Sequence, residues 1–486
     1  MKRAPAVAAG AALAAYFVLL AAVNSYVAGG SDSSGYLNAA RLFARGRVWK
    51  EIPIIRELPL PPSDSEVFLP LALRAGPAPG TMAPRYPPGL PLHMAALALV
   101  GGWGRAPFLA VPYLAIAALV LVFLLARNLG LSRTLAWVAV ALLGASPIFF
   151  GMAIQPMSDV TATAWVAGCL FLGLRSDRSR ISAIAAGAAL GMAVLVRPTN
   201  ILAAIPLAVT LWRGRRRILF AAAGGLPFAA GLVLYDHAAF GKAAETGYGA
   251  MLTWTMALAH AGPVFRHYAY WVPALMTPLL PLAWLLLPFD RRVSGRDRLL
   301  LFSWFAVFLG FYLFYEPFDD WWAVRFLLPG LPAVILAGLL AARDAGEALS
   351  RRFGTRIATA AGAAVLAAAI AVDVRHIVRF DLLRMWEGET VYREASLWTK
   401  SAVEPRSVIL SMQMSGALEY YTGLPVARWD LLTAESFPRI RDAVRGRGFH
   451  WYALLRDFEQ KELPARAPGD WTKIGSVRDV ILWRLD

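Results

Sequence analysis

The sequence contains little charge and almost no cysteine. Charged residues make up 16% of its 486 residues, whereas hydrophobic residues make up 58%, and the mean hydropathy is +0.53. This balance excludes an ordinary soluble protein and is typical of a polytopic membrane protein. The single cysteine, Cys169, lies in an apolar run, which excludes an intramolecular disulfide and a cysteine metal cluster.

Motifs of several common enzyme classes are also missing. The six histidines show no HExxH or HxH spacing, and there is no Walker A loop, GxSxG elbow or dinucleotide fingerprint. The net charge of +16 does not indicate nucleic acid as a partner. The tail from Asp373 to Asp486 holds 17 basic and 16 acidic residues, so the excess lies in the apolar part, where basic residues mark cytoplasmic loops.

Eleven apolar segments are long enough, or nearly so, to cross a bilayer. The first runs from Ala4 to Val23 after Met1-Lys2-Arg3 and is typical of a signal anchor. The others lie near 105–126, 134–150, 158–174, 181–196, 199–212, 218–235, 268–288, 299–315, 325–342 and 357–372. The expected fold is therefore an α-helical polytopic membrane protein of about 11 spans, with residues 1–375 as the transmembrane domain.

The remaining residues, 376–486, alternate helical and strand-like patterns. Helices are expected over 390–403, 415–421 and 434–445, and strands over 407–411, 425–429, 450–455 and in a terminal pair around 474–483. Such alternation predicts a small soluble α/β domain.

The distribution of basic residues predicts the orientation in the membrane. With the N-terminus in the cytoplasm, inner segments carry nineteen Lys and Arg residues, and short outer loops carry four: Arg197, Lys242, Arg266 and Arg325. This places the C-terminal domain and a first loop of about 29–104 on the exterior of an inner (plasma) membrane. Leu90 to Val100 is interpreted as an interfacial or re-entrant helix, because a further span would reverse every later loop.

Asp32 is the first candidate functional residue because it directly follows the first span. From Tyr36 onward apolar residues recur every three or four positions, which predicts a helix along the membrane surface, capped by Ser33 or Ser34. Asp32 then has two interpretations: an acid at a helix start, or a general base acting on a substrate hydroxyl.

Further polar candidates share the expected outer face. They are Arg85, Tyr86, Asp159, Arg197, Asp319, Asp320 and Arg325. Arg85, in Arg-Tyr-Pro-Pro-Gly, is either a phosphate-binding fork on a rigid backbone or a snorkelling interfacial side chain. Asp320 and Arg325 either form an ion pair beside an interfacial tryptophan pair or act on a ligand. Acids and arginines together suit a hydroxyl attacking a carbon whose leaving group is a lipid-bound phosphate.

Taken in order, these segments resemble the GT-C superfamily of membrane glycosyltransferases. The resemblance is to bacterial relatives of protein O-mannosyltransferases, lipid A aminoarabinose transferases and rhizobial lipopolysaccharide glycosyltransferases. The matching segments are 32–37, 85–89, 125–127, 158–159, 191–200 and 325–329, and their order and spacing agree up to about residue 340.

The resemblance implies a polyprenyl-phosphate-linked sugar donor, a glycan, lipid or protein hydroxyl as acceptor, and inverting transfer of a hexosyl or pentosyl group. It implies Asp32 as the base and Asp159 as a second acid that binds a metal or orients the acceptor. Tyr36, Arg85, Tyr86, Arg197, Asp319, Asp320 and Arg325 would contact substrate. A divalent metal at Asp32 and Asp159 stays open, because the family's Asp-Glu pair and metal-ligating glutamate have no match here.

Two other classes share the many spans and membrane-embedded charges. One is a transporter or flippase of lipid-linked sugar, which is disfavoured because no internal repeat is visible. The other is a non-catalytic scaffold that presents the tail to a partner. Turnover of the donor by purified protein would separate all three.

Overall fold

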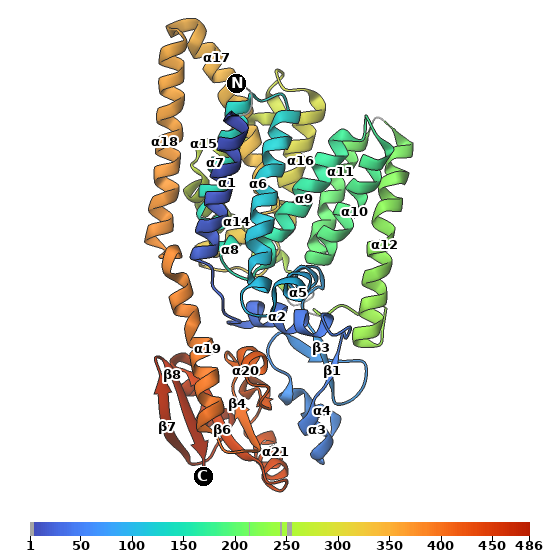
Figure 1. Cartoon of the computed structure of the whole chain (residues 1–486), viewed down its shortest axis with the longest axis vertical. Coiled ribbons are helices and arrows are strands. Elements are labelled where there is room, and N and C mark those ends of the chain that lie inside the picture. The colour runs from blue at the N-terminus through green and yellow to red at the C-terminus, as the bar shows by residue number, and fades with distance from the viewer. Residues whose placement is uncertain (1–3, 213, 244, 250–254) are drawn as a thin grey trace. The chain divides into compact units, whose positions relative to one another are not determined.

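The computed structural model describes residues 4–212, 214–243, 245–249 and 255–486 (Figure 1). Lys2, Arg3 and Arg213, which contribute to the count of inner basic residues, lie outside this part. The chain divides into two compact units that interleave along the sequence. Unit 1 comprises Met1–Asn24, Val111–Ala230 and Ala250–Leu383, and unit 2 comprises Ser25–Ala110, Gly231–Gly249 and Arg384–Asp486.

Unit 1 is built from helices. They are α1 (Ala4–Ala22), α6 (Ala110–Asn128), α7 (Arg133–Ala145), α8 (Pro147–Ala153), α9 (Ser158–Arg175), α10 (Arg180–Val196), η3 (Pro198–Ala203), α11 (Ala204–Leu211), α12 (Arg215–Phe240, which continues into unit 2), α14 (Ala261–Met276), α15 (Leu279–Leu286), α16 (Gly295–Tyr312), η6 (Trp321–Leu327), α17 (Leu331–Phe353) and α18 (Thr355–Arg379). Helices α9 and α10 pack along each other, as do α15 and α17.

Within the described residues, three helices are long and apolar enough to cross a membrane: Ala106–Asn128, Arg216–Phe240 and Thr355–Arg379. Three bent pairs raise that number to six if each pair is one span. The protein is thus a multi-pass helical membrane protein, whereas the total of about 11 spans stays a prediction.

Three expected spans are not straight helices. The segments expected at 134–150, 268–288 and 325–342 contain bends of 66°, 115° and 85°. Pro147 and Pro332 lie in the first turns of α8 and α17, and Pro278 precedes α15. Proline is favoured in the first turn of a helix, where its missing N–H needs no partner, so these three prolines lie where a new helix begins in a new direction.

Unit 2 contains two sheets and the helices packed on them. Its N-terminal part holds α2 (Ser31–Phe43), β1 (Lys50–Glu51), α3 (Pro53–Glu57), α4 (Pro62–Ser65), η1 (Glu66–Phe68), β2 (Leu73–Ala75), β3 (Thr81–Pro84), α5 (Gly89–Gly101) and η2 (Ala106–Leu109). The three strands form an antiparallel sheet in the order β1-β3-β2. Helix α5 confirms a helix over the apolar piece before the second expected span, and its interfacial placement stays a prediction.

The C-terminal part of unit 2 confirms a small α/β fold. It consists of α19 (Met385–Ala402), β4 (Ser407–Leu410), α20 (Ser415–Tyr421), β5 (Val426–Ala427), α21 (Ser436–Arg445), β6 (His450–Arg456), α22 (Leu463–Arg466), β7 (Trp471–Val477) and β8 (Val480–Leu485). The sheet order is β5-β4-β6-β8-β7, with β4 parallel to β5 and β6 and the last two strands antiparallel.

The first loop and the C-terminal domain share one hydrophobic core. Ile54, Phe68 and Leu73 from the loop pack in the same cluster as Val408 and Trp451 from the five-stranded sheet. All five side chains are buried. Unit 2 is therefore held together by apolar packing between segments more than 300 residues apart in sequence.

Helix α2 begins earlier than expected, at Ser31, and its N-cap is Gly30 rather than Ser33 or Ser34. The hydroxyl of Ser34 instead donates to the carbonyl of Gly30, inside the first turn. Asp32 is consequently in the first turn, where a negative charge interacts favourably with the positive end of the helix dipole.

Candidate active site

Asp32 and Tyr86 form the polar centre of unit 2. The Tyr86 hydroxyl is hydrogen-bonded to the Asp32 carboxylate, and it lies 2.9 Å from the Ser31 hydroxyl. An ionised carboxylate can only accept, so Tyr86 donates to Asp32 and Ser31 donates to Tyr86. Burial raises the pKa of Tyr86 well above its usual value, and the nearby charge of Asp32 raises it further. Tyr86 is therefore a neutral donor that fixes the carboxylate.

Glycine at position 35 lets Tyr86 approach α2 this closely. A Cβ added at Gly35 would lie 2.8 Å from the Tyr86 ring and 2.3 Å from Cβ of Ala72. The rings of Tyr36 and Tyr86 lie 5.0 Å apart, and Tyr248 makes an edge contact with Tyr86 at 6.3 Å. The structure thus brings three sequence-predicted residues together: Asp32, Tyr36 and Tyr86.

Arg85 is placed by the same turn. It is half-buried at the end of β3, and its backbone nitrogen donates to the carbonyl of Ala72. Its own carbonyl is covered by Gly247, where an added Cβ would lie 1.9 Å from the Arg85 oxygen. The rigid backbone expected of Arg-Tyr-Pro-Pro-Gly is therefore fixed on both sides by close packing.

Helix α20 supports α2 from the C-terminal domain. The Asn38 side chain donates to the Gly416 carbonyl at 3.0 Å, and the backbone nitrogen of Leu71 donates to the Ser415 hydroxyl at 3.0 Å. A Cβ added at Gly416 would lie 2.2 Å from the Ser34 hydroxyl oxygen, so the backbone of α20 packs directly against the Ser34 side chain of α2. The sequence analysis missed Asn38 and Gly416, because no spacing links two helices this far apart in the chain.

In unit 1, Asp159 and Arg197 form a buried ion pair. Their Oδ1 and Nη2 atoms lie 2.8 Å apart, and the side chains are 1% and 14% exposed. Asp159 is in the first turn of α9, and Arg197 has an extended backbone where Pro198 ends α10. The local sequence therefore places the acid at a helix start and the arginine at a helix break, and packing brings them together.

Aromatic side chains surround the arginines of unit 1. The ring of Phe326 stacks on Tyr312 with 5.3 Å between centroids, and the guanidinium carbons of Arg197 and Arg325 lie 5.7 and 5.2 Å from the Phe326 centroid. The Tyr312 hydroxyl is 2.8 Å from that of Thr199. Tyr312 and Thr199 were not predicted as site residues, although Thr199 lies two residues after Arg197.

The acids at 319 and 320 are on the surface. Both are exposed, and the Asp320 carboxylate accepts a hydrogen bond from the Trp322 indole at 3.1 Å. The Arg325 guanidinium lies 5.1 Å from the Trp322 ring centroid. Within unit 1 the structure therefore groups Arg325 with Trp322 and Phe326, and Asp159 with Arg197.

The described residues of unit 1 form no metal site around Asp159, and metal dependence is left open. The described residues contain no group of three or more His, Cys, Asp or Glu side chains with metal-binding geometry. A cation at Asp159 would also be repelled by the guanidinium 2.8 Å away. In unit 2, the Tyr86 hydroxyl is hydrogen-bonded to both the Asp32 carboxylate and the Ser31 hydroxyl.

Comparison with known proteins identifies the fold. No protein-family model and no curated protein sequence matches the chain. Among solved structures, it is similar to ArnT from Cupriavidus metallidurans bound to undecaprenyl phosphate, with a TM-score of 0.62, 15% identity and coverage of 99% of this chain and 98% of that one.

Two other solved structures extend the comparison. The Archaeoglobus fulgidus oligosaccharyltransferase tethered with an acceptor peptide has a TM-score of 0.63 and 12% identity, over 98% of this chain and 73% of that one. The mycobacterial arabinofuranosyltransferase AftD has a TM-score of 0.57 and 15% identity, over 98% and 39%. The fold is thus the fold of the GT-C membrane glycosyltransferases.

Proposed function

We propose that the protein is a membrane glycosyltransferase that moves a sugar from a polyprenyl-phosphate-linked donor to a hydroxyl of a glycan, lipid or protein. The observation that supports this most directly is the Asp32–Tyr86 pair on a GT-C fold. Solved structures with this fold include ArnT bound to undecaprenyl phosphate and the Archaeoglobus fulgidus oligosaccharyltransferase in complex with a dolichol-phosphate. A carboxylate held by a neutral phenol is suited to accept a proton from a hydroxyl.

The proposed reaction is an inverting displacement. The acceptor oxygen attacks the anomeric carbon of the sugar, and its proton passes to the Asp32 carboxylate. The bond from the anomeric carbon to the phosphate oxygen breaks, and the lipid phosphate leaves with the electron pair. Tyr86 contributes by donating a hydrogen bond that holds the Asp32 carboxylate in position.

The departing phosphate gains negative charge, so a fixed cation near it stabilises the transition state. Of the predicted arginines, Arg325 is favoured for this role over Arg197, because the Arg197 guanidinium already faces the Asp159 carboxylate at 2.8 Å. Aromatic contacts with Trp322 and Phe326 orient the Arg325 guanidinium.

We further propose that the reaction takes place on the exterior face of a plasma membrane, with the N-terminus in the cytoplasm. The count of basic residues supports this orientation. A lipid-delivered donor also agrees with it, because nucleotide sugars are not supplied outside the cytoplasm.

The test is donor turnover by the purified full-length chain in nanodiscs. A panel of polyprenyl-phosphate sugars is supplied with hydroxyl acceptors, and release of polyprenyl phosphate is followed. We expect Asp32→Asn to abolish transfer, because a positioned base is usually worth about 10²–10⁴ in rate. Glu387→Gln is the matched control, since it also removes an acid from the first turn of a helix in unit 2. Normal turnover by Asp32→Asn would reduce Asp32 to a helix-terminal charge.

The same assay separates the proposed function from its rivals. A flippase would move the labelled lipid across the bilayer without releasing the sugar, and a scaffold would do neither. Transfer that survives in Asp32→Asn but is lost in an Asp159→Asn variant that is still folded would move the base to unit 1.

A further inference from the structure

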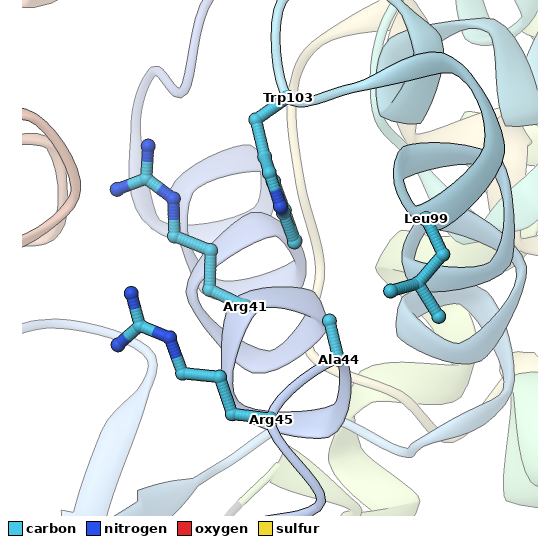
Figure 2. Close-up of a pocket in the computed structure, with 5 residues that line it drawn as sticks. All are labelled: Arg41, Ala44, Arg45, Leu99 and Trp103. Carbon is cyan, nitrogen blue, oxygen red and sulfur yellow. The ribbon is translucent and has the colours of Figure 1, made fainter.

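The C-terminal end of α2 carries two arginines that line a pocket. Arg41 is in the last turn of the helix, and Arg45 lies four residues further on, so both project from the same side. Together with Ala44, Leu99 and Trp103 they line a pocket of about 460 Å³. Figure 2 shows the two guanidinium groups extending in the same direction, with the Trp103 indole beside Arg41 and with Leu99 on the other side of Trp103 and Ala44.

A second pocket of about 320 Å³ adjoins the first and shares both arginines. Its other lining residues include Lys50, Glu419 and Thr422, which are polar. Arg41 and Arg45 therefore lie between the first pocket, which is apolar and aromatic, and the second pocket, which is polar. Such an arrangement matches an amphiphile whose charged group separates a hydrocarbon part from a hydroxylated part.

The two arginines differ in how they are held. The Arg41 guanidinium lies 3.5 Å from the centroid of the Tyr420 ring and donates to the Tyr420 carbonyl, which fixes its position. Arg45 is exposed, and the ion pairs recorded among the described residues do not include it. The only acid in either pocket, Glu419, is engaged by Lys50. The cluster therefore has a net positive charge that an anion would complement.

Apolar side chains are exposed next to these arginines. At the C-terminal end of α5, Leu99 is 69% exposed and Val100 is 90% exposed. Trp103 lies three residues after Val100, and an amphipathic ring of this kind is favoured at headgroup depth. A free inorganic anion would use the arginines but leave the apolar surface in water, whereas a lipid would cover both.

We propose that the pocket formed by Arg41, Ala44, Arg45, Leu99 and Trp103 binds an anionic membrane phospholipid. Its phosphate would lie between the two guanidinium groups, its acyl chains along Leu99 and Val100, and its headgroup hydroxyls toward the polar pocket. Arg41 is nine residues after Asp32. In a helix this spacing corresponds to about 14 Å along the axis and places Arg41 on the opposite face from Asp32. This site is thus separate from the proposed base, and lipid binding does not depend on the proposed function.

Thermal unfolding of the purified full chain in detergent provides the test. Short-chain phosphatidylglycerol, phosphatidylcholine with the same acyl chains, and glycerol phosphate are each titrated. We expect phosphatidylglycerol to raise the melting temperature saturably at concentrations at which the other two have no effect. An equal response to phosphatidylcholine would overturn the proposal, and so would saturation by glycerol phosphate at the same midpoint, which would indicate a free-anion site.

Matched variants locate the site. Arg45→Gln should weaken the phosphatidylglycerol response about tenfold, as expected for loss of one charge-assisted contact. Arg47→Gln is the control, because Arg47 is also exposed and lies two residues away but does not line the pocket. Leu99→Ser should weaken the lipid response through the apolar end. Equal responses from Arg45→Gln and Arg47→Gln, with equal phosphatidylglycerol retained in native mass spectrometry, would overturn the assignment.

Discussion

The buried ion pair between Asp159 and Arg197 allows a quantitative test of unit 1. At 2.8 Å and an effective dielectric constant of about 20, the direct attraction is roughly 6 kcal/mol. Removing each charge from water costs several kcal/mol, so the net contribution of the intact pair is much smaller. Loss of one partner is different, because it leaves an uncompensated charge in a site where the acid is only 1% exposed.

We therefore expect Asp159→Asn and Arg197→Met each to lower the free energy of unfolding by about 3–5 kcal/mol. The double variant should lose less than either single variant, because it buries no charge. With about 2–4 °C of melting temperature per kcal/mol for a domain of 150–250 residues, each single substitution should lower the melting temperature by roughly 6 °C or more.

The assay is thermal unfolding of the full chain in nanodiscs, followed by tryptophan fluorescence. The exposed pair of Arg56 and Glu51 serves as the control, and its variants should change stability by no more than about 1 kcal/mol. Additive losses in the Asp159/Arg197 double variant would refute the reasoning. Turnover by that variant adds a second result: a folded but inactive protein would indicate that Asp159 also orients the acceptor.

Three further predictions concern unit 2 and the topology. Tyr86→Phe should lower kcat by about tenfold or more with little change in the acceptor KM, since a hydrogen bond to a charged group is worth about 1.5–3 kcal/mol; unchanged kcat would show that Asp32 needs no such support. Gly416→Ala should lower both turnover and melting temperature, whereas Gly388→Ala, where an added Cβ meets nothing within 4 Å, should lower neither. Reporter fusions after Arg217 and Arg379 should report opposite sides of the membrane, and two cytoplasmic signals would contradict the proposed orientation.

Local elements were predictable where a single periodic pattern decides the conformation. The helix expected over 415–421 coincides with α20, and the strand expected over 450–455 differs from β6 by one residue. Membrane spans were less predictable, because hydropathy detects an apolar run but does not show whether the helix bends within it. The apolar run around Pro147 continues through a 66° bend.

Candidate residues could be found from the sequence, but their partners could not. Asp159 and Arg197 were noticeable because each is a charge beside long apolar runs, where a charge requires compensation. Their pairing depends on the packing of α9 against α10, which hydropathy does not encode. Likewise, the sequence allowed Arg325 either to pair with Asp320 or to act on a ligand, and it did not indicate that the guanidinium lies 5.1 and 5.2 Å from the ring centroids of Trp322 and Phe326.

The glycines of unit 2 show why the amino-acid sequence alone specifies only part of a site. Gly35 and Gly416 are each required because another side chain or helix occupies the space of the missing Cβ: Tyr86 in the first case and Ser34 in the second. A glycine in sequence signals a turn, a flexible position or a close approach, and only the opposite surface decides between them. Here both glycines act on α2, one on the side of Tyr86 and one on the side of α20. The position of the Asp32 carboxylate therefore depends on contacts of α2 with Tyr86, more than 50 positions away, and with Gly416, more than 370 positions away. The local sequence around Asp32 can identify the acid, but it cannot specify the geometry of the carboxylate.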